Sequence, residues 1–267
     1  MRIALLDGYN LMHRSRFGAK GDNGIIYTFF RSLRPLLAEL NPDKVYLVLE
    51  GVPRHRMNLD EEYKSNRRIE PGTPKWDEMQ EFRRQKNEIV RLLGMLPITV
   101  VRHPDLECDD VIASIALSHD QDECVVVSTD TDFIQLLKHS HIKLYNPVRK
   151  EYVEGVTYDY VAWKSLRGDK SDNIPAVGGM TDKRAEKTLA DPGKLETFLS
   201  EGTNRADYER NLQLVSFKIA PEEQFEVRQP QTDIGGLRKQ FNELRFFSMT
   251  NDTAWSNYAK TFETIYS

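Results

Sequence analysis

Cysteine is scarce in this sequence, and it contains neither long apolar runs nor an excess of positive charge. Only two of the 267 residues are cysteines, Cys108 and Cys124. They fall at an expected helix start and in an expected strand, which favours buried thiols over a disulfide or a zinc pair. No apolar stretch reaches the length of a membrane span, and the apolar part of the N-terminus is too short for a signal peptide. These absences indicate a soluble, cytoplasmic protein without a membrane partner.

The net charge is −4, an average that by itself argues against a nucleic-acid partner. The average is misleading if a cluster of acids holds divalent cations, because the remaining basic residues can then form a local phosphate-binding surface. The length allows one large domain, or one and a half, with a sizeable core. The distribution of charge therefore matters more than its sum.

Short apolar runs alternate with segments whose apolar residues recur at helical spacing. Strands are predicted at residues 2–6, 45–49, 97–101 and 124–127, helices at 25–40 and 76–93, and a hairpin at 142–153. Alternating strands and helices predict an α/β fold with a mostly parallel sheet flanked by helices. The alternation stops at the hairpin, so we expect the sheet to be complete there.

Carboxylates gather where the predicted strands end. They close strands as Asp7, Glu50 and Asp130, and they open the helix after another strand as Glu107, Asp109 and Asp110. The carboxyl ends of parallel strands meet at one edge of a sheet, so these groups should converge. Each alone could simply complement a helix dipole. Together they favour a metal site, because crowded like charges repel unless a cation lies among them. The lack of His and Cys among them points to magnesium or manganese.

Two further segments carry polar or glycine-rich patterns. Residues 53–74 are polar and charged around a lone Tyr63. A connection of this length is functional or disordered, and composition alone leaves a solvated flexible loop open. Residues 177–181 are glycine-rich and enter a helix through Thr181, whose backbone N–H groups suit a phosphate oxygen. Ordinary helix-turn-helix packing would explain these glycines about as well.

Six ordered segments resemble the flap endonuclease/5′-3′ exonuclease family, especially its stand-alone bacteriophage enzymes and the N-terminal nuclease domain of bacterial DNA polymerase I. They are Asp7-Gly8-Tyr9-Asn10, Tyr63-Lys64-Ser65-Asn66-Arg67, Glu107-Cys108-Asp109-Asp110, Ser128-Thr129-Asp130-Thr131-Asp132, Gly168-Asp169-Lys170-Ser171-Asp172-Asn173-Ile174-Pro175 and the glycine hairpin. The resemblance covers roughly residues 1–200, and the tail after about residue 205 is similar only loosely, through residues 244–247.

The resemblance implies a catalytic α/β domain at 1–160 with a helical arch at about 53–92. It also implies a helix-three-turn-helix DNA-binding subdomain and C-terminal helices at 161–267. The expected activity is that of a two-metal phosphodiesterase, a 5′-3′ exonuclease and 5′ flap endonuclease that leaves a 5′ phosphate. Its partner would be double-stranded DNA with a 5′ flap or 5′ end, and RNA paired to DNA is a further candidate. A monomer is expected, in the host cytoplasm if a bacteriophage encodes the chain.

The resemblance also implies roles for individual residues. The first Mg²⁺ would be held by Asp7, Glu50, Glu107 and Asp109, and the second by Asp110, Asp130, Asp132, Asp169 and Asp172, with Mn²⁺ as a substitute. Glu50 departs from the family's usual aspartate. In the arch, Lys64 and Arg67 would engage the scissile phosphate and Tyr63 would stack on a terminal base. Duplex DNA would contact Gly178, Gly179, Thr181, Lys183, Arg184 and Lys187, with a K⁺ ion as a candidate at the Gly178–Gly179 hairpin.

Two rivals from other classes remain. A non-catalytic DNA-binding relative would have lost carboxylates, yet every expected acid is present. A single-strand ribonuclease of the related compact metal-nuclease type would be shorter and would lack the glycine hairpin. Residues 168–187 therefore distinguish the flap endonuclease family from this ribonuclease type.

Overall fold

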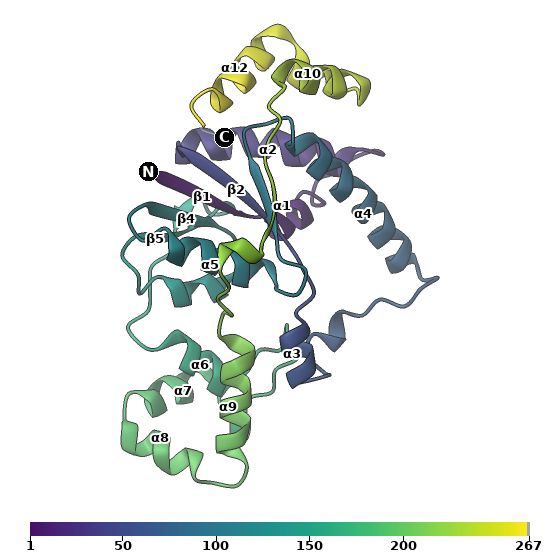
Figure 1. Ribbon diagram of the computed structural model, residues 1–267. Coiled ribbons are helices and arrows are strands. Elements are labelled where there is room, and N and C mark those ends of the chain that lie inside the picture. The colour runs from purple at the N-terminus through teal and green to yellow at the C-terminus, as the bar shows by residue number, and fades with distance from the viewer. Residues whose placement is uncertain (266–267) are drawn as a thin grey trace.

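A seven-stranded sheet forms the centre of the protein (Figure 1). The computed structural model describes residues 1–265. The strands are β1 (Arg2–Asp7), β2 (Lys44–Leu49), β3 (Thr99–Arg102), β4 (Glu123–Val127), β5 (Ile142–Asn146), β6 (Glu151–Tyr152) and β7 (Glu226–Arg228). Their order is β6-β5-β4-β1-β2-β3-β7. Strands β1 to β5 run parallel to one another, and β6 and β7 are antiparallel edge strands.

The predicted strands are confirmed, but the expectation that the sheet ends at the hairpin is wrong. β7 joins the far edge, where Val101 pairs with Val227. All three residues of β7 are exposed. A strand this short, with no buried face, has no apolar alternation by which the sequence could reveal it.

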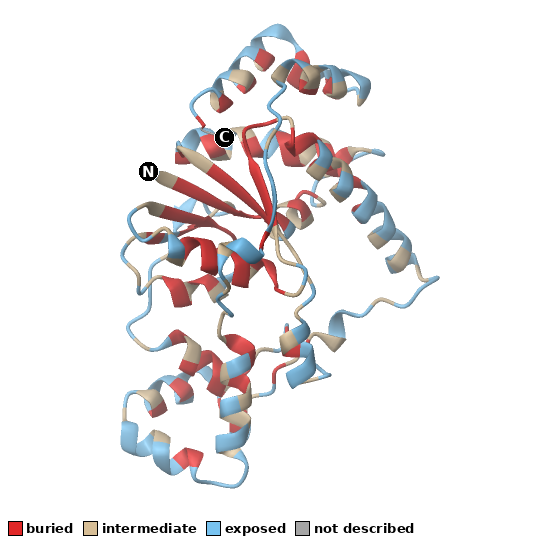
Figure 2. Ribbon diagram, in the orientation of Figure 1, coloured by how far each residue is buried: buried red, intermediate tan, exposed pale blue. Residues whose placement is uncertain are grey.

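Successive side chains of β1 belong to two different cores, as expected for a strand covered on both faces. Figure 2 shows the buried strands of the sheet between two layers of helices. Ala4 and Leu6 pack with helices α2 (Gly24–Leu40), α4 (Pro74–Leu93), α10 (Ile234–Glu243), α11 (Phe247–Thr250) and α12 (Asp252–Phe262). Ile3 and Leu5 pack with α5 (Cys108–Ser118) and the short 3₁₀ helix η2 (Thr131–Leu136). Both cysteines are buried and unpaired, which confirms the prediction of buried thiols.

Helix α4 is fixed to the core at one end only. From its middle onward it buries Phe82, Ile89 and Leu92. The side-chain oxygen of the buried Gln85 accepts hydrogen bonds from the first N–H groups of α2, at 3.0 Å from Ile25 N and 3.3 Å from Ile26 N. The first turns of α4 are mostly exposed and extend beyond the sheet (Figure 2). The helix therefore holds the segment before it, residues 53–73, away from the core.

The segment that follows the hairpin is arranged in two parts (Figure 1). Helices α6 (Tyr160–Arg167), α7 (Asp182–Leu189), α8 (Pro192–Leu199) and α9 (Asn204–Val215) share a small core of their own at one end of the molecule. The chain then returns through β7 to the opposite end, where α10 to α12 pack against α2. Within residues 1–265, none of the helices combines the length and apolar composition of a membrane span.

Candidate metal centre

An open cleft of about 660 Å³ lies at the carboxyl ends of β1, β2 and β4. Eight of the nine predicted metal ligands line it: Asp7, Glu50, Glu107, Asp109, Asp130, Asp132, Asp169 and Asp172. The arch residues Tyr63, Lys64 and Arg67 line it as well. Residues that lie up to 165 positions apart in sequence thus converge where the parallel sheet predicts a site.

Asp7 is held rigidly at the end of β1. It caps α1 (Gly8–Arg14) by accepting a hydrogen bond from Asn10 N at 2.9 Å, and it accepts another from Ser128 Oγ at 2.7 Å. A β-carbon at Gly8 would lie 2.5 Å from the carbonyl oxygen of Val48, so only glycine lets α1 start against β2. These contacts fix one oxygen-bearing side chain at the floor of the cleft.

The deep carboxyl groups resist ionisation in the protein alone. Burial, together with a smaller contribution from the nearby Asp130, raises the pKa of Asp7 to about 6. Burial raises the pKa of Glu50 to about 7, with repulsion from Glu107 adding to it. Burial and the charges of Asp130 and Asp7 also raise the pKa of Asp109 well above its usual value. A divalent cation among these groups would favour their charged forms, so the donor set fits a cation.

These pKa shifts predict how magnesium changes stability with pH. Because Asp7 and Glu50 hold protons more tightly in the folded chain than in the unfolded chain, their contribution to stability falls as pH rises from about 4, near their unfolded pKa values, to about 7. Mg²⁺ favours the ionised carboxylates, so we expect the increase in unfolding temperature caused by Mg²⁺ to grow over the same range. Thermal unfolding in EDTA and in Mg²⁺ measures that difference. An increase that is constant or shrinks with pH would contradict the prediction.

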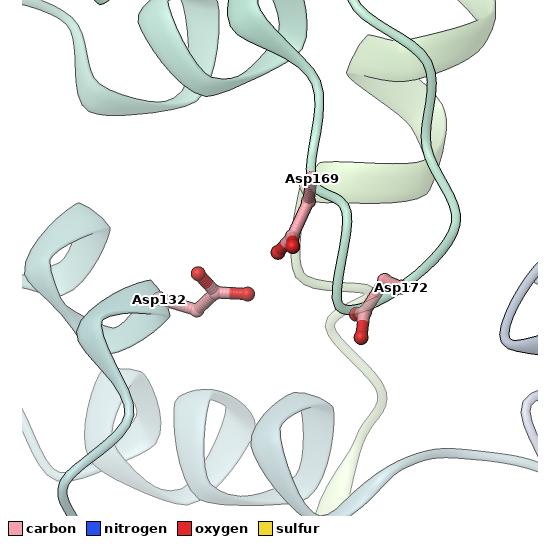
Figure 3. Close-up of side chains that lie close together, drawn as sticks. All are labelled: Asp132, Asp169 and Asp172. Atoms are coloured by element: carbon pink, nitrogen blue, oxygen red, sulfur yellow. The ribbon is translucent and has the colours of Figure 1, made fainter. Parts of the chain in front are cut away.

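A second group of carboxylates, Asp132, Asp169 and Asp172, also lines the cleft. Figure 3 shows Asp132, which follows β4, pointing toward Asp169 and Asp172 on a separate segment. One oxygen each of Asp132, Asp169 and Asp172 lies within 4.8 Å of the others. The buried Lys164 on α6 contacts Asp132, and its Nζ lies 2.6 Å from Asp169 Oδ2. Although burial raises the pKa of Asp169, Lys164 holds it down at about 2. Lys164 was not predicted as a site residue from the sequence. The available signal was its position inside a largely apolar helical segment.

Both predicted arch cations reach into the carboxylates. Lys64 follows α3 (Arg54–Leu59) and precedes the 3₁₀ helix η1 (Ser65–Arg67), and its backbone has a φ of +54°. The backbone N–H of Lys64 donates to the carbonyl oxygen of Asp172 at 2.9 Å. Its ammonium group contacts Glu107 and lies 3.5 Å from Asp172 Oδ2, while Arg67 contacts the other oxygen of Asp172. The polar segment is therefore a built part of the cleft, not a detached solvated loop.

The structure gives Tyr63 a role different from base stacking. Its ring is only 5% exposed and packs with Ile174, Leu214 and Val215. Its hydroxyl donates to Glu107 Oε2 at 2.9 Å. A ring that stacks on a base must present an open face, so this buried tyrosine orders a carboxylate instead.

The prediction that Asp110 binds the second ion is likewise not supported. Asp110 is fully buried outside the cleft lining, and its two oxygens lie 2.7 Å and 2.6 Å from the guanidinium nitrogens of Arg56. The reason is its place in the first turn of α5, where it forms a capping box with Glu107. A carboxylate at this position turns back toward the helix start and away from the cleft.

The glycine hairpin lies between α6 and α7 as η3 (Val177–Gly179). Gly178 and Gly179 have φ values of +52° and +69°, and nothing lies within 4 Å of a β-carbon placed on Gly179. The basic residues of α7 predicted to contact DNA, Lys183, Arg184 and Lys187, are all exposed. A hollow of about 640 Å³ beside Thr181 and Lys183 shares Asp169 with the metal cleft. This hollow, which is lined by the residues on either side of the hairpin, Ala176 and Met180, therefore adjoins the cleft.

Comparison with known proteins gives consistent matches. Residues 2–165 match the family model described as the 5′-3′ exonuclease, N-terminal resolvase-like domain. The thermostable DNA polymerase I of Thermus filiformis is 28% identical over 94% of this chain and 33% of its own length. The chain thus spans a quarter to a third of the length of the polymerase relatives it matches. A 5′-3′ exonuclease of Mycobacterium tuberculosis is also 28% identical, over 76% of this chain and 74% of its own.

The same fold occurs in a solved structure described as a bacteriophage T5 flap endonuclease complex with DNA and metal ions. Its TM-score is 0.64 at 18% sequence identity, and the match covers 98% of this chain and all of the other. The mixed α/β fold with its central sheet and flanking helices is therefore the one expected from the sequence.

Proposed function

Because the chain belongs to the 5′-3′ exonuclease family, we propose that it is a divalent-metal-dependent, structure-specific 5′ nuclease. It hydrolyses phosphodiester bonds in DNA as a 5′-3′ exonuclease and a 5′ flap endonuclease, and it leaves a 5′ phosphate. The observation that carries this proposal is the cleft in which eight carboxylates from both walls meet two cations of the arch. Relatives described as exonuclease and flap endonuclease support it.

The carboxylates fit two Mg²⁺ ions, with Mn²⁺ able to replace them. Asp7, Glu50, Glu107 and Asp109 would hold one ion, and Asp130, Asp132, Asp169 and Asp172 the other. When bound, such ions polarise a phosphate and lower the pKa of an attacking water. The site fits them because burial and mutual repulsion keep several of its carboxyl groups from ionising freely without a cation.

The protein's own groups position the substrate. Lys64 and Arg67 carry positive charge at the cleft, where a scissile phosphate can replace Glu107 and Asp172 as their partner. Cationic groups placed where negative charge develops contribute most in the transition state. The buried hydroxyl of Tyr63 keeps hold of Glu107 during this exchange.

Duplex DNA would lie along the surface that joins the cleft to the hairpin. The open backbone at Gly179 and the exposed Lys183, Arg184 and Lys187 suit phosphate oxygens, so binding would not depend on base sequence. An RNA strand paired to DNA is a proposed further substrate, and a K⁺ ion is proposed at the hairpin. We also propose that the protein acts as a monomer in the cytoplasm.

The two rival functions lack support from the same residues. A non-catalytic relative would not require a cleft in which eight carboxylates converge. A compact single-strand ribonuclease has no use for a hairpin that presents an open backbone beside exposed basic residues.

One experiment tests the proposal directly. The purified protein is incubated with a 5′-labelled flap substrate and with a 5′-labelled blunt duplex, each in Mg²⁺ and in EDTA, and the products are sized. Products near the flap length show endonuclease activity, and mononucleotides from the duplex show exonuclease activity. No cleavage of either in Mg²⁺, or cleavage only of single-stranded RNA, would refute the proposed function.

The hairpin gives a prediction about substrate affinity. Gly179→Leu should weaken duplex binding and raise KM more than it lowers kcat, because a side chain here blocks the approach of a phosphate. Affinity for the flap substrate is measured in Ca²⁺ to prevent turnover. Gly202→Leu is the matched control, since Gly202 also has a positive φ and open space around it. Equal affinities for the wild type and Gly179→Leu would contradict a phosphate contact at the hairpin.

A further inference from the structure

Arg56, which no sequence motif singles out, uses every N–H donor of its guanidinium group. Nη1 donates to Glu107 Oε2 at 2.8 Å and to Asp110 Oδ2 at 2.6 Å. Nη2 donates to Asp110 Oδ1 at 2.7 Å and to the carbonyl oxygen of Ser216 at 3.0 Å, and Nε donates to the carbonyl oxygen of Leu214 at 2.8 Å. The side chain is 3% exposed, so these five hydrogen bonds form out of contact with water.

Arg56 and its partners belong to three separate parts of the molecule. Arg56 lies on α3, seven residues before Tyr63, where the arch leaves the sheet domain. Glu107 and Asp110 lie at the start of α5, beside the ligand Asp109. Leu214 and Ser216 end α9, the last helix of the subdomain that carries the glycine hairpin. α3 also packs directly against α9 (Figure 1).

The bonds to Glu107 bear directly on the cleft. Arg56 and Tyr63 both donate to Oε2, which leaves Oε1 to contact Lys64. Arg56 therefore determines which carboxylate oxygen is free to face a metal ion or the arch lysine. Lysine could not replace it fully, because an ammonium group has three donors and lacks the planar fork that meets both oxygens of Asp110.

We propose that Arg56 is a positioning residue that fixes the foot of the arch and the orientation of Glu107 relative to the metal cleft. It acts through Glu107 and Asp110 and touches neither substrate nor metal. The inference rests on the proposed nuclease function and adds the residue by which the arch, the cleft and the hairpin subdomain keep their mutual positions.

The main test is Arg56→Lys, which keeps a positive charge beside Asp110 and loses the fork. Single-turnover cleavage of the flap substrate in Mg²⁺ should fall by roughly tenfold to a hundredfold, the scale expected when catalytic groups move by about 1 Å. Affinity for the same substrate in Ca²⁺ should stay close to the wild-type value. Limited proteolysis of the metal-free protein should cut residues 60–73 faster than in the wild type.

Arg54→Ala is the matched control on the same helix. Arg54 is 71% exposed, and among residues 1–265 its ion pair is with the half-exposed Asp105, so its loss should change neither cleavage nor proteolysis. Wild-type cleavage and wild-type proteolysis in Arg56→Lys would overturn the inference. So would an Arg56→Lys chain that fails to fold, because the residue would then be needed for folding alone.

A double variant separates positioning from simple charge neutralisation. Arg56→Met leaves two buried carboxylates without their cation, and adding Asp110→Asn removes one of those charges. We expect the second change to recover part of the lost unfolding temperature while cleavage stays low. Recovery of both would mean that Arg56 only balances charge.

The readouts also separate the two proposals. If the wild-type protein itself fails to cut the flap in Mg²⁺, the proposed function fails, whereas the proteolysis of residues 60–73 still tests the position of the arch.

Discussion

Replacing Asp130 and Asp132 together with asparagine is expected to lower cleavage of a flap substrate by about a thousandfold or more, with DNA binding at or above the wild-type level. Each removed charge weakens the hold on a cation that stabilises the transition state, and the loss of one such stabilising group typically costs 10²–10³ in rate. Both carboxylates face the cleft, so their removal also reduces repulsion of the phosphate backbone.

The measurement pairs single-turnover cleavage in Mg²⁺ with flap affinity in Ca²⁺. Asp120→Asn with Asp122→Asn is a control of the same spacing outside the cleft, and within the described residues 1–265 the ion pair of Asp122 is with the N-terminal amine. The prediction is contradicted if binding is lost in parallel with cleavage, since the carboxylates would then support the fold or the interface rather than the chemistry.

Lys64→Ala is expected to reduce single-turnover cleavage by roughly a hundredfold, while affinity for a duplex without a flap changes little. Lys64 projects from the arch into the carboxylates, where charge develops during cleavage and not where a duplex first docks. Lys75→Ala is the control, because Lys75 is an exposed lysine at the start of α4 that does not line the cleft.

The same segment predicts a constraint on the path of the flap. If the 5′ strand passes under the arch, a bulky block attached to the 5′ end before the enzyme is added should slow cleavage. The block should matter less when it is attached after the complex has formed. If Lys64→Ala cleaves at the wild-type rate and a blocked flap is cut normally, the arch does not contribute to cleavage.

The parts of this molecule that follow local rules could be predicted from the sequence. β1 and β2 appear as unbroken apolar runs because both faces of a parallel sheet are covered. The convergence of Asp7, Glu50 and Asp130 follows from the same fold, since parallel strands end at one edge. The ligand assignments rest on the family resemblance, and the structure brings eight of the nine together.

The parts that depend on distant partners could not be predicted. Arg56 stands in a polar stretch with other basic residues, and its partners lie 51 to 160 positions away. Lys164 likewise meets Asp132 across 32 positions. An aromatic side chain such as Tyr63 in a charged segment gives no sign of whether it faces solvent or a small core. The spacing of apolar residues indicates which face of a helix or strand is buried. It carries no information about which charged residues form pairs.

The backbone of Lys64 adds an energetic consequence to its position. A residue with a β-carbon at a φ of +54° is held in a left-handed conformation that costs roughly 1–2 kcal/mol. The hydrogen bond from its N–H to Asp172 and the ion pairs of its side chain oppose that preference. A ligand that competes for Glu107 and Asp172 removes the ion pairs but leaves the hydrogen bond to the carbonyl oxygen of Asp172, so part of the opposition is lost. Occupation of the cleft and the conformation of the turn at Lys64 are therefore thermodynamically linked.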